Sequence, residues 1–233
     1  MLRVVNLTKK FGNFVVLNDI SFSIEENEIL GLIGPNGSGK TTMFNIISGL
    51  LSPNSGKIFF GGREITKLSP NDICKLGIAR TFQIPRLFEN LSVEENIFLG
   101  ALAKYDIEKA KEKTHEIMRF FGIEKLRETK AKYLTSGDRK LVELSRALAT
   151  QPKLLLIDEI FYGFNPREID SVLEFLNEIL KMGITICIIE HRLKQIMKIL
   201  DRVIVLCGGR IIANGKPEEI CSNKEVIKHY LGS

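Results

Sequence analysis

The sequence predicts an α/β fold, in which helices cover both faces of a parallel sheet and a helical segment is inserted into that core. In the last third of the chain, short apolar runs typical of buried strands alternate with stretches of helical spacing. Strands of this kind, separated by helices, are typical of parallel sheets. Between Val93 and Leu148 the pattern is helical and rich in polar residues, so we interpret this stretch as the insertion.

Turn signals and hydrophobic spacing place the individual elements. The turn Pro53–Gly56 precedes the β-type run Lys57–Phe60, and apolar residues at helical spacing follow the run Ile29–Ile33. The expected strands are Leu2–Leu7, Ser21–Ile24, Ile29–Ile33, Lys57–Phe60, Leu154–Ile157, Ile184–Ile189 and Val203–Leu206, and the expected helices are Thr41–Leu50, Arg167–Met182 and Leu193–Leu200.

Composition and charge exclude several classes of protein. The chain has 233 residues, of which 44% are hydrophobic and 26% charged, so we expect a buried globular core. No apolar stretch approaches about 18 residues, and the N-terminus resembles a strand rather than a signal peptide, which predicts a cytoplasmic protein. The net charge of +5 does not indicate nucleic acid binding, because acidic side chains alternate with the basic side chains between Lys104 and Lys132. Free buried thiols are expected at Cys74, Cys187, Cys207 and Cys221.

A glycine-rich segment predicts a phosphate-binding loop. The pattern Gly34-x-x-x-x-Gly39-Lys40-Thr41 follows an apolar run and opens a helix, which is the context this motif requires. Its backbone N–H groups and the helix N-terminus would face phosphate oxygens. Lys40 is expected to reach the β- and γ-phosphates and the Thr41 hydroxyl to bind Mg²⁺. The expected ATP contacts of the segment are Gly34, Pro35, Asn36, Gly37, Ser38, Gly39, Lys40, Thr41 and Thr42.

Two acids end a second apolar run. Asp158 and Glu159 follow Leu154–Ile157, so they would emerge at the carboxyl edge of the sheet, where parallel sheets bind ligands. Asp158 can hold Mg²⁺ through water, and Glu159 is placed to orient or deprotonate an attacking water. Because a phosphate-binding loop lies upstream, the pair indicates a nucleotide-hydrolysing site rather than two acids that merely start a loop.

With these motifs the chain resembles the nucleotide-binding subunits of ABC transporters over nearly its whole length. Phe11 matches the aromatic residue that stacks on adenine, and Val16 lies nearby in the sequence. Gln83 matches the glutamine that contacts Mg²⁺ and senses the γ-phosphate. His191 matches the switch histidine, so the resemblance assigns catalysis to Glu159 and His191.

Two further segments match parts that the family uses in its dimers. Leu134–Asp138 occupies the signature position before a helix, and Gly163–Pro166 matches the loop that crosses the dimer interface. The signature departs from the usual Leu-Ser-Gly-Gly-Gln, and the Asp138 carboxylate should weaken a phosphate contact unless Arg139 or Lys140 offsets it. The expected contacts with the ATP of a partner subunit are Thr135, Ser136, Gly137 and Asp138.

Three segments indicate a particular subfamily of these ATPases. Gly77–Phe88, Leu91–Asn96 and Ala213–Ile220 resemble the ATPases of branched-chain amino acid importers. Lipopolysaccharide-export ATPases are near relatives and stay an alternative. The altered signature leaves open a regulatory module that binds nucleotide without turnover. A non-transport ABC protein acting on DNA or ribosomes would usually carry a second nucleotide domain or a long coiled coil.

The resemblance implies a domain organisation, cofactors and partners. A single P-loop NTPase domain would span 1–233, with an N-terminal antiparallel β subdomain, a nucleotide-binding core over 1–83 and 153–233, and a helical subdomain over 84–152. ATP and Mg²⁺ would lie in a head-to-tail dimer with a second ATPase subunit, either a copy or a paralogue. The partners would be membrane-spanning permease subunits docking at Ile84–Asn90, with no nucleic acid, and the chain would lie at the inner face of the cell membrane. The expected metal contacts are Thr41, Gln83 and Asp158.

Overall fold

A computed structural model describes residues 1–228, which form two compact units. The first unit contains Met1–Ile73 and the described residues from Thr185 onward, and the second contains Cys74–Ile184. The division into a core and a helical subdomain over 84–152 stays a prediction. No helix within residues 1–228 combines the length and the apolar character that crossing a bilayer would require.

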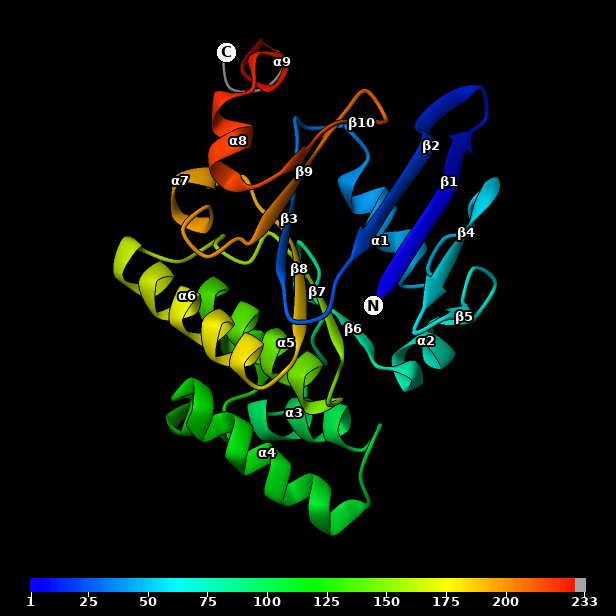
Figure 1. The fold of residues 1–233 in the computed structure, drawn as a ribbon. Coiled ribbons are helices and arrows are strands. Elements are labelled where there is room, and N and C mark those ends of the chain that lie inside the picture. Colours follow the sequence, from blue (N-terminus) through cyan, green and yellow to red (C-terminus); the bar gives the residue numbers. More distant parts are fainter. Residues whose placement is uncertain (229–233) are drawn as a thin grey trace. The chain divides into compact units, whose positions relative to one another are not determined.

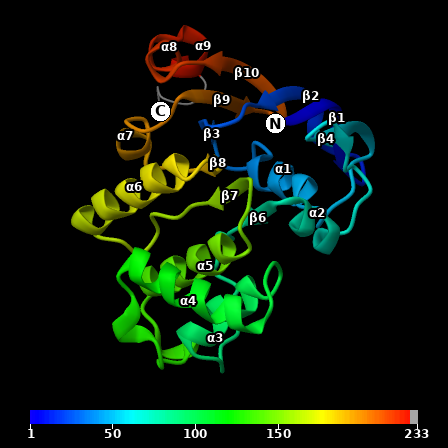
Figure 2. The same ribbon diagram turned by 60° about the horizontal axis from the view of Figure 1, so that its bottom comes forward.

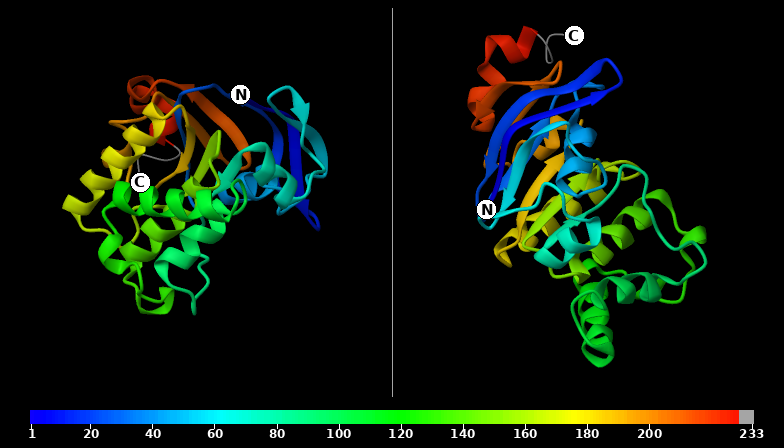
Figure 3. Two further views of the ribbon diagram at one scale, coloured as in Figure 1. Left: turned by 90° about the horizontal axis from the view of Figure 1, so that it is seen from below. Right: turned by 90° about the vertical axis from the view of Figure 1, so that its right-hand side faces the viewer.

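An antiparallel sheet forms one part of the first unit. Its strands are β1 (Leu2–Phe11), β2 (Phe14–Ile24), β4 (Ser55–Phe60) and β5 (Arg63–Glu64), in the order β2-β1-β4-β5. β1 lies between β2 and β4, which Figure 1 and the right panel of Figure 3 show. The predicted strands Leu2–Leu7 and Ser21–Ile24 were too short, because the polar residues between them continue the pairing as a hairpin that closes at Phe11 and Phe14.

Parallel strands carry the remaining core of the first unit. β3 (Ile29–Ile33) pairs in parallel with β8 (Thr185–Ile189) and β9 (Arg202–Cys207), and β10 (Arg210–Gly215) pairs antiparallel to β9. Every residue of β3 and β8 is buried, as expected of strands covered on both faces. The helices of this unit include α1 (Lys40–Ile47), α7 (Leu193–Ile196), α8 (Pro217–Ser222) and α9 (Lys224–Val226).

Helix α7 is shorter than the predicted helix Leu193–Leu200. It ends after Ile196, and Asp201 then pairs with the start of β3. The Asp201 carboxylate accepts the N–H of Ile29 at 2.8 Å, and the Asp201 N–H donates to the Ile29 carbonyl at 3.0 Å. Leu200 packs so closely on Gly31 that a Cβ there would lie 2.5 Å from its Cδ1 atom.

The second unit is mainly helical. Its two strands, β6 (Ile78–Arg80) and β7 (Leu154–Asp158), pair in parallel. Figure 2 shows α3, α4 and α5 gathered together, and α3 contacts both of the others. The helices and short 3₁₀ turns are α3 (Val93–Ala101), α4 (Ile107–Phe121), η1 (Glu124–Leu126), η2 (Ala131–Tyr133), α5 (Ser136–Ala149) and α6 (Pro166–Lys181), and α2 (Pro70–Leu76) spans the boundary between the units in the sequence.

Side-chain caps fix where the helices of the second unit begin. Ser92 and Glu95 form a capping box at α3, Asp106 caps α4, and Asn165 caps α6 with Pro166 as its first residue. Each cap satisfies backbone N–H groups that would otherwise lack partners at a helix start. The stretch from Val93 to Leu148 is confirmed as mainly helical, while its interpretation as an insertion stays a prediction.

The cysteines only partly match their prediction as buried free thiols. All four are free, and Cys187 is buried in β8, where burial raises the pKa of its thiol. Cys74 and Cys207 are half-buried, and Cys221 is exposed. The prediction of burial was wrong for Cys221 because it lies on the outer side of the short helix α8 rather than in a strand.

Candidate nucleotide site

The predicted phosphate loop lies between β3 and α1 and has a backbone that only glycine fits at two positions. Gly34 has φ +150°, and a Cβ there would collide with the Leu206 carbonyl oxygen of β9. Gly39 has φ +105°, and its Cβ would lie 2.6 Å from Cδ2 of Leu17. The glycines of the motif are therefore required by close packing as well as by backbone conformation.

Polar groups of this loop suit a bound phosphate. Buried Lys40 donates from Nζ to the carbonyls of Gly34 at 2.8 Å and Pro35 at 2.9 Å, so the ammonium lies over its own loop. Within the described residues, the buried Ser38 Oγ has no hydrogen-bond partner, and no side chain caps the N-terminus of α1. An anion held by the loop amides would satisfy these donors. The arrangement therefore fits the phosphates of a nucleotide.

The other predicted residues of the first unit lie at its surface. Phe11 ends β1 with 49% of its surface exposed, opposite Phe14 in the hairpin, and Val16 is half-buried. An exposed aromatic face can stack on a base. His191 is exposed, and its backbone N–H donates to the buried Glu190 carboxylate at 3.1 Å. Sequence reasoning did not single out Phe14, whose exposure of 69% makes it a second candidate for stacking.

In the second unit, Asp158 ends β7 with a fully buried side chain. Its Oδ2 atom pairs with Nη2 of Arg80 at 3.1 Å, and the Arg80 side chain is also buried. Burial raises the pKa of Asp158, although the Arg80 guanidinium opposes that rise. The Oδ1 atom has no hydrogen-bond partner in the part of the chain that the structure describes. A buried carboxylate oxygen with unused capacity is of the type that binds Mg²⁺.

Glu159 and Gln83 lie together in the second unit. Gln83 Nε2 donates to Glu159 Oε2 at 2.9 Å, although the two residues are far apart in the sequence. Glu159 has φ +49°, a left-handed conformation that is unfavourable for a residue with a side chain. Strained backbone of this kind concentrates at functional sites, which supports a functional role for Glu159.

The signature segment forms the start of α5. Thr135 caps the helix by accepting the N–H of Asp138, and its hydroxyl donates to the Asp138 carboxylate at 2.6 Å. The Asp138 carboxylate is therefore hydrogen-bonded within the signature segment. Both partners, Thr135 and Asp138, are residues that differ from the usual signature. Ser136 and Gly137 pack closely on Gly163 and Phe164. A Cβ on Gly163 would lie 2.6 Å from Ser136 Oγ, and a Cβ on Gly137 would lie 3.0 Å from the Phe164 ring.

Three buried charged residues around these positions were missed as site residues by sequence reasoning. Arg80 pairs with Asp158, while Lys140 and Glu143 of α5 bind the backbone that carries Gln83. A lysine and a glutamate three residues apart in a helix are typical of an ion pair on the exposed helix surface. The only signal against that reading is the apolar sequence around them, since Val142 and Leu144 belong to the core.

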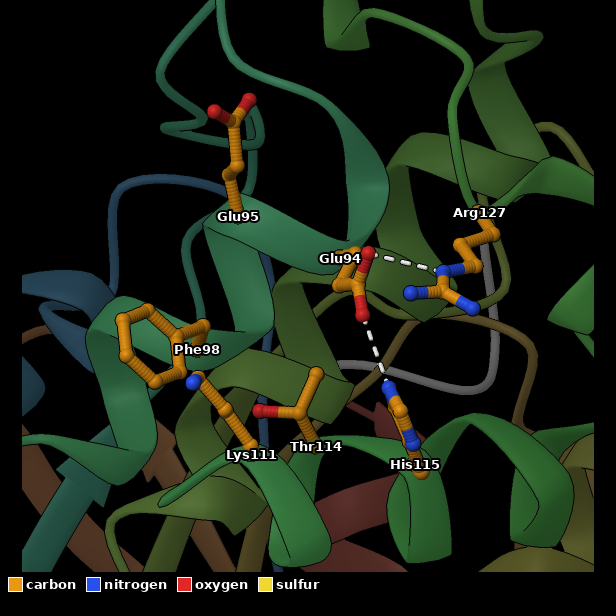
Figure 4. A pocket seen from close by; sticks show the side chains of 7 residues that line it. All are labelled: Glu94, Glu95, Phe98, Lys111, Thr114, His115 and Arg127. Atoms are coloured by element: carbon orange, nitrogen blue, oxygen red, sulfur yellow. Dashed lines mark hydrogen bonds and ion pairs between the residues drawn. The ribbon is translucent and has the colours of Figure 1, made fainter. Parts of the chain in front are cut away.

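A further pocket of about 310 Å³ lies between α3, α4 and the segment that follows α4. Figure 4 shows that Glu94 points toward both Arg127 and His115 there, with 2.8 Å between its carboxylate oxygens and the nearest nitrogen of each. None of the predicted site residues lines this pocket, which is formed by Glu94, Glu95, Phe98, Lys111, Thr114, His115 and Arg127.

Comparison with known proteins gives matches over the whole chain. The profile of the family described as ABC transporter matches residues 17–162, and that of the branched-chain amino acid ATP-binding cassette transporter matches residues 210–233. A probable branched-chain amino acid transport ATP-binding protein LivG of Archaeoglobus fulgidus is 38% identical, over 100% of this chain and 96% of that protein. The lipopolysaccharide export system ATP-binding protein LptB of Haemophilus influenzae is 32% identical, over 100% and 97%.

Solved structures give the same result for the fold. The ADP conformation of an ATP-binding cassette of an ABC transporter matches with a TM-score of 0.88 and 33% identity, over 100% of this chain and 99% of that one. A dimeric cassette in a post-hydrolysis state, bound to ADP and phosphate, matches with a TM-score of 0.86 and 26% identity, over 93% and 99%. These likenesses confirm the predicted α/β fold of the P-loop NTPase type.

Proposed function

Because the chain belongs to the ATP-binding subunits of ABC transporters, we propose that it hydrolyses ATP to drive the import of branched-chain amino acids. Its membership makes it a nucleotide-binding ATPase. The import of branched-chain amino acids is supported by the match of residues 210–233 to that transporter family and by the identity to LivG. The observation that carries ATP turnover is the contact between Gln83 and Glu159 next to the buried Asp158.

The site residues take the following roles in our proposal. The amides of the phosphate loop and Lys40 bind the β- and γ-phosphates, while Phe11 stacks on the base. Glu159 orients the attacking water or accepts its proton, and the contact with Gln83 orients the Glu159 carboxylate. His191 contacts the γ-phosphate. Thr41, Gln83 and Asp158 would hold Mg²⁺, which when bound neutralises charge on the phosphate oxygens.

A second ATPase subunit completes the site in this proposal. The signature residues Thr135, Ser136, Gly137 and Asp138 would contact the ATP of the partner. A dimeric arrangement is supported by the solved cassette bound to ADP and phosphate, which is a dimer. ATP would then be contacted from both subunits, and hydrolysis would remove the bridging phosphate. The N-terminal turn of α5, which these residues form, suits an anionic partner because of its helix dipole.

Membrane-spanning permease subunits would dock on residues 84–90, which directly follow Gln83. Ile84 is 80% exposed and Phe88 52% exposed, which is unusual for side chains of this kind. Asn96 fixes the end of the segment, because its side chain bonds both the N–H of Phe88 at 2.9 Å and its carbonyl at 3.1 Å. The chain would accordingly lie on the cytoplasmic side, at the inner face of the cell membrane.

The direct test compares wild type with Glu159→Gln, alone and with the permease subunits reconstituted in vesicles. We expect ATP-driven uptake of labelled leucine by wild type, and a loss of about 10²–10⁴-fold in turnover with nucleotide binding retained in the variant. Equal, near-zero rates for both would favour a regulatory module. Turnover without uptake of any branched-chain amino acid would favour an export ATPase.

A further inference from the structure

Charged side chains of α5 hold the backbone on both sides of Gln83. We call residues 81–88 the Gln83 loop. Lys140 Nζ donates to the carbonyls of Phe82 at 3.0 Å and Gln83 at 2.7 Å. Glu143 accepts the N–H groups of Phe82 at 2.9 Å and Arg86 at 2.7 Å. Residues three apart share one helix face, so a single face of α5 binds the loop.

The burial of these two side chains makes the attachment strong. Lys140 is 2% exposed and Glu143 1% exposed. A buried charge is costly unless hydrogen bonds and an opposite charge compensate it. Here the backbone of the loop provides those hydrogen bonds, and the lysine and the carboxylate attract each other. The Gln83 loop cannot leave α5 without stranding both charges, so its conformation follows the position of the helix.

Lys140 also binds the end of β7, directly before Glu159. Its ammonium donates to the Asp158 carbonyl at 3.3 Å, one residue before Glu159. Gln83 and Glu159 are themselves joined through their side chains at 2.9 Å. One ammonium therefore fixes the two backbone segments whose side chains meet in the proposed hydrolytic pair.

We propose that Lys140, with Glu143, is a positioning residue for ATP hydrolysis, because it sets the orientation of Gln83 against Glu159. The inference rests on the proposed roles of those two residues. Since α5 begins at the signature segment, any displacement of that segment would also be transmitted to the pair. ATP turnover should then depend on Lys140 much more than ATP binding does.

Steady-state ATPase and nucleotide binding measured on the full chain would test this. Lys140→Met should lower kcat by about 100-fold, the scale expected for a misplacement of about 1 Å, and change the Kd of a fluorescent ATP analogue by less than about threefold. Lys140→Arg should recover kcat to within about tenfold, because a guanidinium also donates to carbonyls. The matched control is Lys109→Met, which removes an exposed lysine paired with Glu112 in α4 and should leave both quantities unchanged.

A double variant separates positioning from a general loss of structure. Lys140→Met should add little to the defect of Glu159→Gln, because both act on one step. Losses that multiply would overturn the inference, as would an unchanged kcat or a Kd that weakens in parallel with kcat. If Lys140→Met fails to fold, Glu143→Gln decides in its place, since the amide can satisfy only one of the two N–H groups, and an unchanged kcat there refutes the inference. An inactive wild type, by contrast, would refute the proposed function itself.

Discussion

The phosphate loop and the Gln83 loop are held in different ways. The phosphate loop is held within the first unit: Lys40 binds carbonyls five and six residues earlier in the chain, and the glycines pack on Leu17 and Leu206. The Gln83 loop is fixed from outside, by buried side chains of α5 that lie 57 to 61 residues later. The phosphate loop therefore has no attachment to α5 among these contacts, whereas the Gln83 loop follows that helix.

This difference assigns nucleotide binding and turnover to separate structural controls. Binding depends on a local feature, so it should tolerate changes in α5. Turnover depends on contacts between distant segments, so changes at buried charges of the second unit should affect it strongly. The following predictions, ordered by expected size, probe that separation.

The largest effect is expected at the ion pair behind the acids. Arg80→Met would leave the buried Asp158 carboxylate without its partner guanidinium, and breaking such a pair costs about 3–5 kcal/mol of unfolding free energy. Urea denaturation followed by circular dichroism measures the change. Arg3→Met, which removes an exposed arginine lying over Phe59, is the control. Equal, small losses of unfolding free energy in both variants would show that the buried Asp158 carboxylate does not need the Arg80 guanidinium.

The phosphate loop should respond to a single methyl group. Gly34→Ala would place a Cβ against the Leu206 carbonyl, so we expect a loss of about 3 kcal/mol in stability and no measurable binding of a fluorescent ATP analogue. Gly61→Ala is the matched control, because Gly61 also has a positive φ but faces open space. The control should cost only about 1–2 kcal/mol and keep binding. Retained nucleotide binding in Gly34→Ala would contradict the requirement for glycine at this position of the loop.

The cap of α5 should have a smaller effect that falls on turnover. Thr135→Ala removes the acceptor for the Asp138 N–H and should cost about 1 kcal/mol of stability. It should also slow ATP hydrolysis while the monomer binds nucleotide as before. Asp106→Ala, at the cap of α4, should cost a similar amount without a change in turnover. A variant of Thr135 that binds nucleotide poorly would break the proposed separation.

The smallest effect is expected at Glu94, in the pocket of Figure 4. Burial would raise the pKa of Glu94, but hydrogen bonds from Arg127 and His115 outweigh it and hold that pKa below its usual value. The carboxylate therefore stabilises the fold above the unfolded pKa of about 4.3, and this contribution is lost as the pH falls through the lower, folded pKa. Glu94→Gln should cost about 0.5 kcal/mol at pH 7 and nothing near pH 3, measured by urea titration at both values. A difference that grows toward acid would have the wrong sign.

The sequence predicts the locally determined features well and the long-range ones poorly. Ile29–Ile33 and its glycine-rich continuation were predictable because the conformation is dictated by neighbouring residues. The hairpin that closes at Phe11 and the early end of α7 were not, because pairing partners and the Asp201 contacts decide them. Lys140 and Glu143 were missed for the same reason: a sequence shows that a residue is charged, but not which distant backbone it binds.

The left-handed backbone of Glu159 has a consequence for how this chain would change under selection. A residue without a Cβ relieves such strain, so Glu159→Gly should raise the unfolding free energy by about 1 kcal/mol while it removes the carboxylate. A population screened only for survival of heating would therefore drift toward glycine or asparagine at this position. Keeping glutamate there requires continuous selection for turnover, and thermal resistance and activity are opposed at this one residue.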